Sequence, residues 1–217
     1  MRKYEYRGVI FDLDGVLTDT AHYHYLAWKR LAESIGASFD EAFNEQLKGV
    51  DRMGSLNLIL EASGKDFSEA YKLTLADEKN LHYQSLIAQL SPADLLPGAA
   101  ASLQLIRAAG LKTALASVSK NAQAVIERLG IADQFDVVVD AAKIKNSKPD
   151  PEIFLTAAAG LGLTADVCFG VEDSIAGIRA IKSANMFALG IGSPAVLTEA
   201  DVVIAGLHQF SLQDYLK

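Results

Sequence analysis

Short apolar runs alternate with longer helix-type repeats along most of the chain. The apolar runs that predict strands lie at 8–11, 111–117, 135–139, 167–171 and 186–191, with a weaker one at 202–204. Helical patterns between the later runs lie at 99–109, 120–129, 151–160 and 174–183. Strands that alternate with helices in this way predict a mainly parallel sheet covered by helices on both faces.

The stretch between residues 18 and 95 breaks this alternation. It carries no convincing strand, and its helical patterns lie at 23–35, 39–48, 52–61 and 67–90. We therefore predict an α/β core domain made of residues 1–17 and 93–217, and an inserted all-helical domain over 18–92. A helical insertion after the first strand can lie over the end of that strand as a lid, with hinges at 18–20 and 91–98. A permanently packed helical subdomain is the alternative.

Composition narrows the classes of protein that fit. Half of the 217 residues are hydrophobic, which allows a sizeable core. The net charge of −7 disfavours nucleic acid as a partner, because duplex binding usually needs a concentrated basic face. No segment reaches the ~18 apolar residues of a membrane span, and residues 1–7 lack the apolar stretch of an export signal.

The single cysteine, Cys168, cannot form a disulfide within the chain. Its apolar neighbours favour a buried structural thiol over a nucleophile. Together with the absence of membrane and export signals, this predicts a cytoplasmic protein with no membrane partner.

Two carboxylates follow the first strand directly. Asp12 and Asp14 are two residues apart, so their side chains point to the same side of an extended chain. They lie at the carboxyl end of the strand, where open α/β sheets bind ligands. Two anions so close repel unless a cation or a proton intervenes, which suggests a divalent metal, acid–base chemistry, or both. The alternative is a polar strand end that leads into a turn at Gly15.

Polar residues also follow the later strands. Ser117 ends the second strand and is followed by residues 119–121, Lys148 lies in a loop after the third, and the fourth ends in Glu172 and Asp173. In a parallel sheet these ends share one edge, so residues far apart in the sequence can converge. An oxygen-rich site of this kind suits Mg²⁺, which prefers a few carboxylates together with waters and a phosphate.

These motifs, in this order, resemble those of the haloacid dehalogenase-like phosphotransferases. The resemblance covers residues 8–192, and the helical insertion resembles the cap of that family. It implies a doubly wound, mainly parallel α/β core with an inserted helical cap. Stretches at 18–24, 43–52 and 114–121 are similar to members of the family that move a phosphoryl group within a hexose phosphate.

The resemblance assigns roles at the sheet edge. Asp12 corresponds to the nucleophile that accepts a phosphoryl group, and Asp14 to the general acid and base. Ser117 and Lys148 correspond to residues that bind the transferring phosphoryl oxygens. One Mg²⁺ per subunit is the implied cofactor, held by the metal-site residues Asp12, Asp14, Glu172 and Asp173.

A second phosphate site is implied on the other side of the substrate. Arg52 follows Asp51, a predicted helix N-cap, and guanidinium binds phosphate in a bidentate fork. Ser119 is likewise a predicted N-cap. The resemblance implies that Arg52, Ser119, Lys120 and Asn121 hold the phosphate that is not transferred. Without it, Arg52 reads as a solvated arginine, and residues 119–121 as a turn and cap.

His24 and Lys79 are further candidates that depend on the resemblance. His24 lies just past the first hinge, where it could orient Asp14 in the closed form. Lys79 matches a cap lysine of the family. Without the resemblance, His24 reads as a surface or packed helix residue and Lys79 as a solvated charge.

The resemblance implies an isomerase that interconverts β-glucose 1-phosphate and glucose 6-phosphate through a phospho-aspartate, with β-glucose 1,6-bisphosphate as primer and intermediate. Hexose phosphates are then its partners, and we expect a monomer. A Mg²⁺-dependent sugar-phosphate phosphatase is the main alternative, and a catalytically idle sugar-phosphate sensor is a third.

Overall fold

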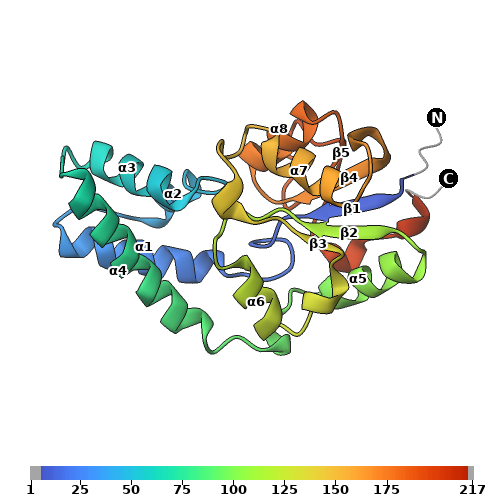
Figure 1. The fold of residues 1–217 in the computed structure, drawn as a ribbon, viewed down its shortest axis with the longest axis horizontal. Helices are drawn as coiled ribbons and strands as arrows, with labels where there is room; N and C mark the ends of the chain where they lie inside the picture. Colours follow the sequence, from blue (N-terminus) through green and yellow to red (C-terminus); the bar gives the residue numbers. More distant parts are fainter. Residues whose placement is uncertain (1–5, 215–217) are drawn as a thin grey trace.

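The computed structural model describes residues 6–214. The predicted absence of an export signal therefore falls mostly on residues outside the described part, as do residues 215–217 of the predicted core. A six-stranded parallel sheet with the order β3-β2-β1-β4-β5-β6 forms the centre (Figure 1). Its strands are β1 (Gly8–Phe11), β2 (Lys112–Leu115), β3 (Val137–Val138), β4 (Cys168–Glu172), β5 (Phe187–Ile191) and β6 (Val202–Ile204). The predicted doubly wound α/β class is confirmed.

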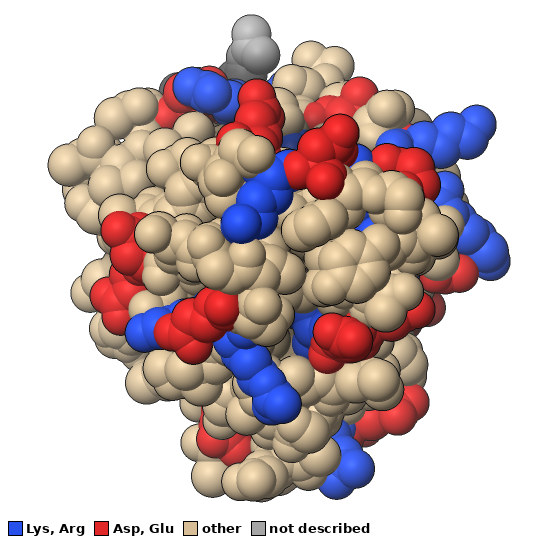
Figure 2. Space-filling model, turned by 90° about the vertical axis from the view of Figure 1, so that its left-hand side faces the viewer, with Lys and Arg blue, Asp and Glu red and all other residues tan. Residues whose placement is uncertain are grey.

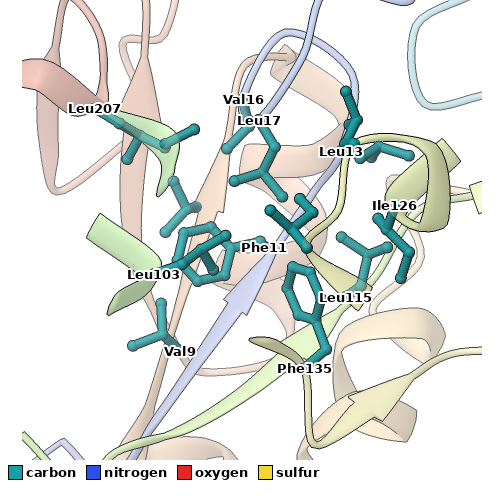
Figure 3. Packing of buried hydrophobic residues seen from close by; sticks show 14 of the residues in the cluster. Val9, Phe11, Leu13, Val16, Leu17, Leu103, Leu115, Ile126, Phe135 and Leu207 are labelled. Atoms are coloured by element: carbon teal, nitrogen blue, oxygen red, sulfur yellow. The ribbon is translucent and has the colours of Figure 1, made fainter. Parts of the chain in front are cut away.

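Helices cover both faces of the sheet (Figure 1). They are α5 (Ala99–Ala108), α6 (Ala122–Arg128), α7 (Glu152–Gly160) and α8 (Ile175–Ser183). Alternate residues of β1 point to opposite faces. Val9 and Phe11 pack in the cluster that includes Leu103 of α5 and Ile126 of α6, as Figure 3 shows, whereas Ile10 joins the cluster built with α7 and α8. This burial on both sides explains why β1 is apolar at every position.

Four helices follow β1 and extend beyond the end of the sheet (Figure 1). They are α1 (Ala21–Ser34), α2 (Glu41–Glu45), α3 (Arg52–Ala62) and α4 (Glu69–Ile87). They enclose a separate apolar cluster that includes Trp28, Leu56 and Leu75. The end of α4 also reaches the sheet, because Tyr83 and Ile87 belong to the core cluster of β1. Figure 2, which views this side of the molecule, shows acidic and basic side chains interspersed on the surface.

The two connections between these helices and the sheet run side by side. Thr18 and Leu95 form an antiparallel bridge, and the Leu96 N–H donates to the carbonyl of Leu17 at 2.9 Å. The Thr18 hydroxyl donates to the carbonyl of Asp94 at 2.9 Å. Both predicted hinges therefore lie in two connecting segments that are hydrogen-bonded side by side, here called the paired strap.

Most predicted helices are present but shorter than their sequence patterns. The pattern over 39–48 yields only the five residues of α2, whereas the weak strand at 202–204 has its predicted bounds. Short 3-10 helices lie at Pro92–Asp94, Ala132–Gln134, Ala141–Lys143, Ala165–Val167, Leu207–Gln209 and Leu212–Asp214. Among the described residues, no helix is both long enough and apolar enough to cross a membrane.

Cys168 lies within β4 with no exposed surface, and its burial raises the pKa of the thiol to about 11. A thiol held protonated and away from solvent is a packing residue rather than a nucleophile, as its neighbours in the sequence predicted.

Candidate active site

The order in which the chain adds strands to the sheet reverses between β1 and β4, and the acidic residues gather at this point. β1 pairs with β4 on one side and β2 on the other, so the chain connections diverge there. Such a switch point leaves a crevice at the carboxyl ends of the strands. Asp12 is the first residue after β1, and its N–H donates to the carbonyl of Val171 at 2.9 Å. Glu172 is the last residue of β4, so both side chains are set by the register of the sheet.

Asp12, Glu172 and Asp173 form a tight carboxylate cluster. Each offers an oxygen within 4.8 Å of the others. The buried ammonium of Lys148 joins two of them, at 2.5 Å from Asp12 and 2.8 Å from Glu172. Burial raises the pKa of Asp12 to about 6 in spite of this ion pair, and burial with the neighbouring Glu172 raises the pKa of Asp173 to about 7. The cluster therefore resists carrying all of its negative charge.

Asp14 faces the same cluster from the turn after β1. Its Oδ1 is buried and has no hydrogen-bond partner in the described part of the chain. Burial, reinforced by the charges of Asp12 and Asp173, holds the pKa of Asp14 well above its usual range. A carboxyl group in this environment can keep a proton near neutral pH, which suits a general acid.

Two glycines let the carboxylates approach the backbone. Gly15 has φ +76°, and a Cβ there would lie 2.2 Å from an oxygen of Asp173. A Cβ on Gly177 would lie 1.9 Å from the carboxyl carbon of Glu172. Oε1 of Glu172, the oxygen that does not bind Lys148, accepts from the Ser174 hydroxyl at 2.8 Å. This bond fixes the side chain of Glu172.

The cluster fits a divalent cation. Four carboxylates, those of Asp12, Asp14, Glu172 and Asp173, face two ammonium groups, because Lys148 pairs with the first cluster and Lys48 contacts Asp173 at 3.1 Å. When all four are ionised, at least two negative charges are left for a cation to balance, and the donors are all oxygens. Hard cations such as Mg²⁺ prefer this donor set.

The opposite wall of the pocket comes from the helices and carries positive charge. Arg52 is the first residue of α3, whose N-cap Asp51 accepts from two backbone N–H groups as predicted. The Arg52 guanidinium donates to Oδ1 of Asn80 at 2.8 Å, and its nearest carboxylate, the exposed Asp77, is 3.8 Å away. No other residue of 6–214 accepts a hydrogen bond from it, so most of its N–H donors are open to a ligand.

Lys79 is buried in this wall, not solvated. Its ammonium lies 2.9 Å from Nδ1 of His24 and 4.5 Å from the ring centre of Trp28. Burial, together with the charge of Arg52, lowers the pKa of Lys79 to about 7. The His24 ring stacks on Tyr83 with centres 4.0 Å apart, and no hydrogen bond joins it to Asp14 in residues 6–214. Burial and the two cations hold the pKa of His24 well below its usual range.

The loop after β2 supplies the remaining predicted residues. Ser117 is buried, and its hydroxyl accepts from the Ser119 N–H at 3.2 Å. The prediction that Ser119 caps a helix is wrong, because α6 begins at Ala122 and its N-cap is Asn121. Ser119 instead accepts from the Asn121 N–H at 3.3 Å, which tightens the turn before the helix. Because α6 has only seven residues, its dipole adds little to the binding of an anion at this end of the pocket.

One pocket between the sheet edge and the helices brings the predicted residues together. It is lined by all of them except Lys148, which lies against the cluster and pairs with Asp12 and Glu172. The predicted residues that line it are Asp12, Asp14, His24, Arg52, Lys79, Ser117, Ser119, Lys120, Asn121, Glu172 and Asp173. Acidic groups line this pocket from the sheet edge, and basic and amide donors line it from the helices and the loop after β2, which together form its helical end.

Four residues around this pocket were not predicted from the sequence. Lys48 pairs with Asp173, and Asn80 contacts both Arg52 and Asn121. Ser147 donates to Asp51 at 2.7 Å and so joins the helical insertion to the loop before Lys148. Gln84 lies one turn after Asn80 and donates to Asn121 at 3.0 Å. The sequence gives one signal for two of them: Lys48 and Asn80 lie close in sequence to the predicted residues Arg52 and Lys79. Their contacts could not be predicted, because their partners are distant in sequence.

Comparisons with known proteins agree with this architecture. A family model described as haloacid dehalogenase-like hydrolase matches residues 6–185. The chain is 46% identical over 209 residues to a protein of Bacillus subtilis named beta-phosphoglucomutase, a match that covers 95% of this chain and 92% of the relative. It is 34% identical over 182 residues to a phosphorylated carbohydrates phosphatase of Thermotoga maritima, covering 82% of each.

Solved structures give the same result. A crystal structure of beta-phosphoglucomutase from Clostridium difficile superposes with a TM-score of 0.95 at 47% identity, covering 96% of this chain and 95% of that one. The family model spans strands β1 to β4 and the helical insertion. The chain belongs to the haloacid dehalogenase-like hydrolase family.

Proposed function

We propose that this protein is a phosphotransferase that interconverts β-glucose 1-phosphate and glucose 6-phosphate through a phospho-aspartate and β-glucose 1,6-bisphosphate. The observation that carries the proposal is a pocket with two different ends. Asp12 and Asp14 lie at one end, and Arg52 with Asn121 lies at the other. A substrate that carries a phosphate on either side of its sugar needs both. The relatives named beta-phosphoglucomutase support this choice within the family.

At the sheet edge, Asp12 is the proposed nucleophile. Its carboxylate oxygen attacks phosphorus, the bond from phosphorus to the sugar oxygen breaks, and Asp14 gives its proton to that oxygen. In the reverse transfer, Asp14 takes the proton from the attacking hydroxyl. The raised pKa of Asp14 suits a group that alternates between the two forms. Ser117 donates a hydrogen bond to the phosphoryl oxygens, and the Lys148 ammonium offsets the charge that develops on them.

Mg²⁺ is the proposed cofactor, one per subunit, with Asp12, Asp173 and the backbone carbonyl of Asp14 as ligands and Glu172 in or beside the shell. When bound, it shields the negative charges of nucleophile and phosphate from each other. A chelator should abolish turnover, and added Mg²⁺ should restore it.

At the helical end, Arg52, Ser119, Lys120 and Asn121 are proposed to hold the phosphate that is not transferred. From the same wall, Lys79 would bind the substrate, and His24 would orient Asp14 in the closed form. Because a sugar bisphosphate must turn around between the two transfers, the residues at this end have to bind either of its phosphates.

We further propose that residues 18–92 form a cap that closes over the core formed by 1–17 and 93–217. The paired strap at Thr18 and Leu95 would be the hinge. The contact of Ser147 with Asp51 is one that an opening motion would break. Closure excludes water, which otherwise hydrolyses the phospho-aspartate. Location in the cytoplasm and a monomeric state stay predictions.

The deciding experiment incubates the protein with Mg²⁺, β-glucose 1-phosphate and a trace of β-glucose 1,6-bisphosphate. Formation of glucose 6-phosphate, dependent on the primer, supports the mutase. Release of inorganic phosphate without isomerisation would contradict it. A parallel reaction with α-glucose 1-phosphate tests whether the anomer matters.

A sugar-phosphate phosphatase is the second candidate. It is favoured by the similarity to the phosphatase of Thermotoga maritima, since the catalytic end of the pocket suits both reactions. The two candidates differ in the need for the helical end: a phosphatase requires one phosphate site and a water.

A further inference from the structure

Three side-chain amides form a chain beside the helical end of the pocket. Asn80 and Gln84 lie one turn apart on α4, and Asn121 is the N-cap of α6. Gln84 Nε2 donates to Asn121 Oδ1 at 3.0 Å, and Asn121 Nδ2 donates to Asn80 Oδ1 at 2.9 Å. The same oxygen of Asn80 accepts from Arg52 at 2.8 Å. These hydrogen bonds, here called the amide chain, therefore connect the helical insertion to the core at Asn121 and return to the insertion at Gln84.

Arg52 sets the direction of every bond in this chain. A guanidinium has donors and no acceptor, so Asn80 must present its oxygen to it. Asn121 must then present its nitrogen to that oxygen. Its own oxygen is left for Gln84, which must donate. A single arrangement of the three amides satisfies all of these requirements.

The direction matters because Asn121 and Asn80 line the pocket and Gln84 does not. With its oxygen occupied by Gln84, Asn121 keeps its N–H groups for Asn80 and for a ligand. A reversed amide would bring the oxygen of Asn121 against the oxygen of Asn80 and against any anion held there. Two facing acceptors repel, and each loses a hydrogen bond.

We infer that Gln84 is a positioning residue: by holding the oxygen of Asn121, it presets the Asn121 carboxamide, and through Asn80 the Arg52 guanidinium, for an anionic ligand. This inference rests on the proposed function, in which that ligand is the phosphate that is not transferred. Gln84 touches no reacting group. Its effect is confined to how well the helical end is organised before the substrate arrives.

The local structure makes Gln84 a clean residue to change. Gln84 is exposed, so replacing it removes little packing. The end of α4 has a separate attachment to the core, because Arg128 of α6 donates to the carbonyl of Ala88 at 3.1 Å. A substitution at 84 should therefore act on the amide chain and leave α4 in place.

The test is Gln84→Glu, which has nearly the same shape but only accepts hydrogen bonds. We expect the KM for β-glucose 1-phosphate and for the bisphosphate to rise about tenfold, with kcat within about twofold. Gln84→Leu removes the donor without reversing the amide, so its KM should rise about threefold. Gln89→Glu, at an exposed glutamine just beyond α4, adds the same charge and should leave the KM unchanged.

A second readout separates positioning from damage to the fold. Phosphorylation of Asp12 by acetyl phosphate, which carries one phosphate, should proceed at the wild-type rate in Gln84→Glu. A disturbed helix would slow this step and lower the thermal midpoint as well, and that result would overturn the inference.

The outcomes distinguish this inference from the proposed function. An active wild type with an unchanged KM in both Gln84 variants, or the same rise in Gln89→Glu, overturns the inference alone. A wild type that does not convert β-glucose 1-phosphate overturns the proposed function and the inference with it.

Discussion

The two walls of the pocket differ in charge and in how they are held. The sheet-edge wall has a surplus of carboxylates, and its residues follow directly from strands whose register fixes them, as for Asp12 and Glu172. The helical wall carries Arg52 and Lys79 with little carboxylate to balance them. Its residues are held by side-chain contacts between helices that are separated in sequence.

This difference suggests a division of labour. A rigid acidic edge can bind a cation and position a nucleophile, because backbone geometry sets its side chains. A cationic wall made by an insertion can attract an anionic substrate and release it when the insertion moves. The predictions below test whether chemistry and recognition are separable in this way.

The largest expected effect is at the sheet edge. Asp12→Asn keeps the size of the side chain but removes the nucleophile, so primed turnover should fall by about 10⁴-fold or more. Circular dichroism should show an intact fold. Asp133→Asn, at an exposed position, is the matched control and should be fully active. Wild-type turnover in Asp12→Asn would remove the chemical role of this wall.

Asp14→Asn should lower turnover by about 10³-fold, because it removes the proton donor and acceptor for the sugar oxygen. Phosphorylation of Asp12 by acetyl phosphate should be much less affected, since its leaving group needs little protonation. The ratio of the two rates is the measurement. Equal losses in both reactions would mean that Asp14 acts on the cluster and not on the leaving oxygen.

Lys79→Met tests how much the buried charge of Lys79, in the cationic wall, lowers the stability of the folded protein. The pKa of Lys79 is about 7 in the folded protein, below the 10.5 of an ordinary lysine, so the unfolded chain binds more protons between these values. Stability should therefore rise with pH across this window, and the penalty should be complete below pH 7.

Removing this charge should raise the free energy of unfolding at pH 7 by about 2–4 kcal/mol and flatten its dependence between pH 7 and 10. Urea denaturation at several pH values measures both. Lys143→Met, at an exposed lysine, should change neither. A less stable Lys79→Met protein would show that the ammonium stabilises the wall.

Arg52→Ala tests recognition directly. Mutase turnover at low substrate should fall about 30-fold, because a charge-assisted pair with phosphate is lost, while Mg²⁺ binding stays at the wild-type level. Calorimetric titration with Mg²⁺ and initial rates give the two quantities. Arg30→Ala, at an exposed arginine of α1, serves as the control. Weaker Mg²⁺ binding in Arg52→Ala would show that the two walls are coupled.

The smallest expected effect comes from two glycine substitutions. Their comparison separates the cost of backbone strain from the effect of displacing the Asp173 carboxylate. Gly15→Ala and Gly36→Ala both place a side chain at positive φ, at +76° and +67°. The positive φ alone should cost each variant about 1 kcal/mol of stability. Only the first puts a Cβ against Asp173, since a Cβ at Gly36 would meet nothing within 4 Å. Mg²⁺ affinity should fall about tenfold in Gly15→Ala alone. Equal affinity in both would show that Asp173 can move freely.

The sequence determined the alternation of strands and helices and the location of the acidic residues at strand ends. Period and composition are local properties, and β1 shows why they suffice: its apolar run and the Asp12–Gly15 turn encode a buried strand that ends in a polar loop. The ends of helices depend on more than these local properties. Ser119 has the chemistry of a cap, but the tight turn at Ser117 delays the helix to Ala122.

Tertiary structure alone decided how distant side chains pair. Lys79 reads as a solvated charge in its helix, yet the packing of α1 against α4 buries it beside His24 and Trp28. The amide chain from Arg52 to Gln84 has no sequence signal, because its members satisfy one another only once α3, α4 and α6 meet. Local patterns fix what each segment can form, whereas desolvation and hydrogen-bond partners depend on which segments come together in space.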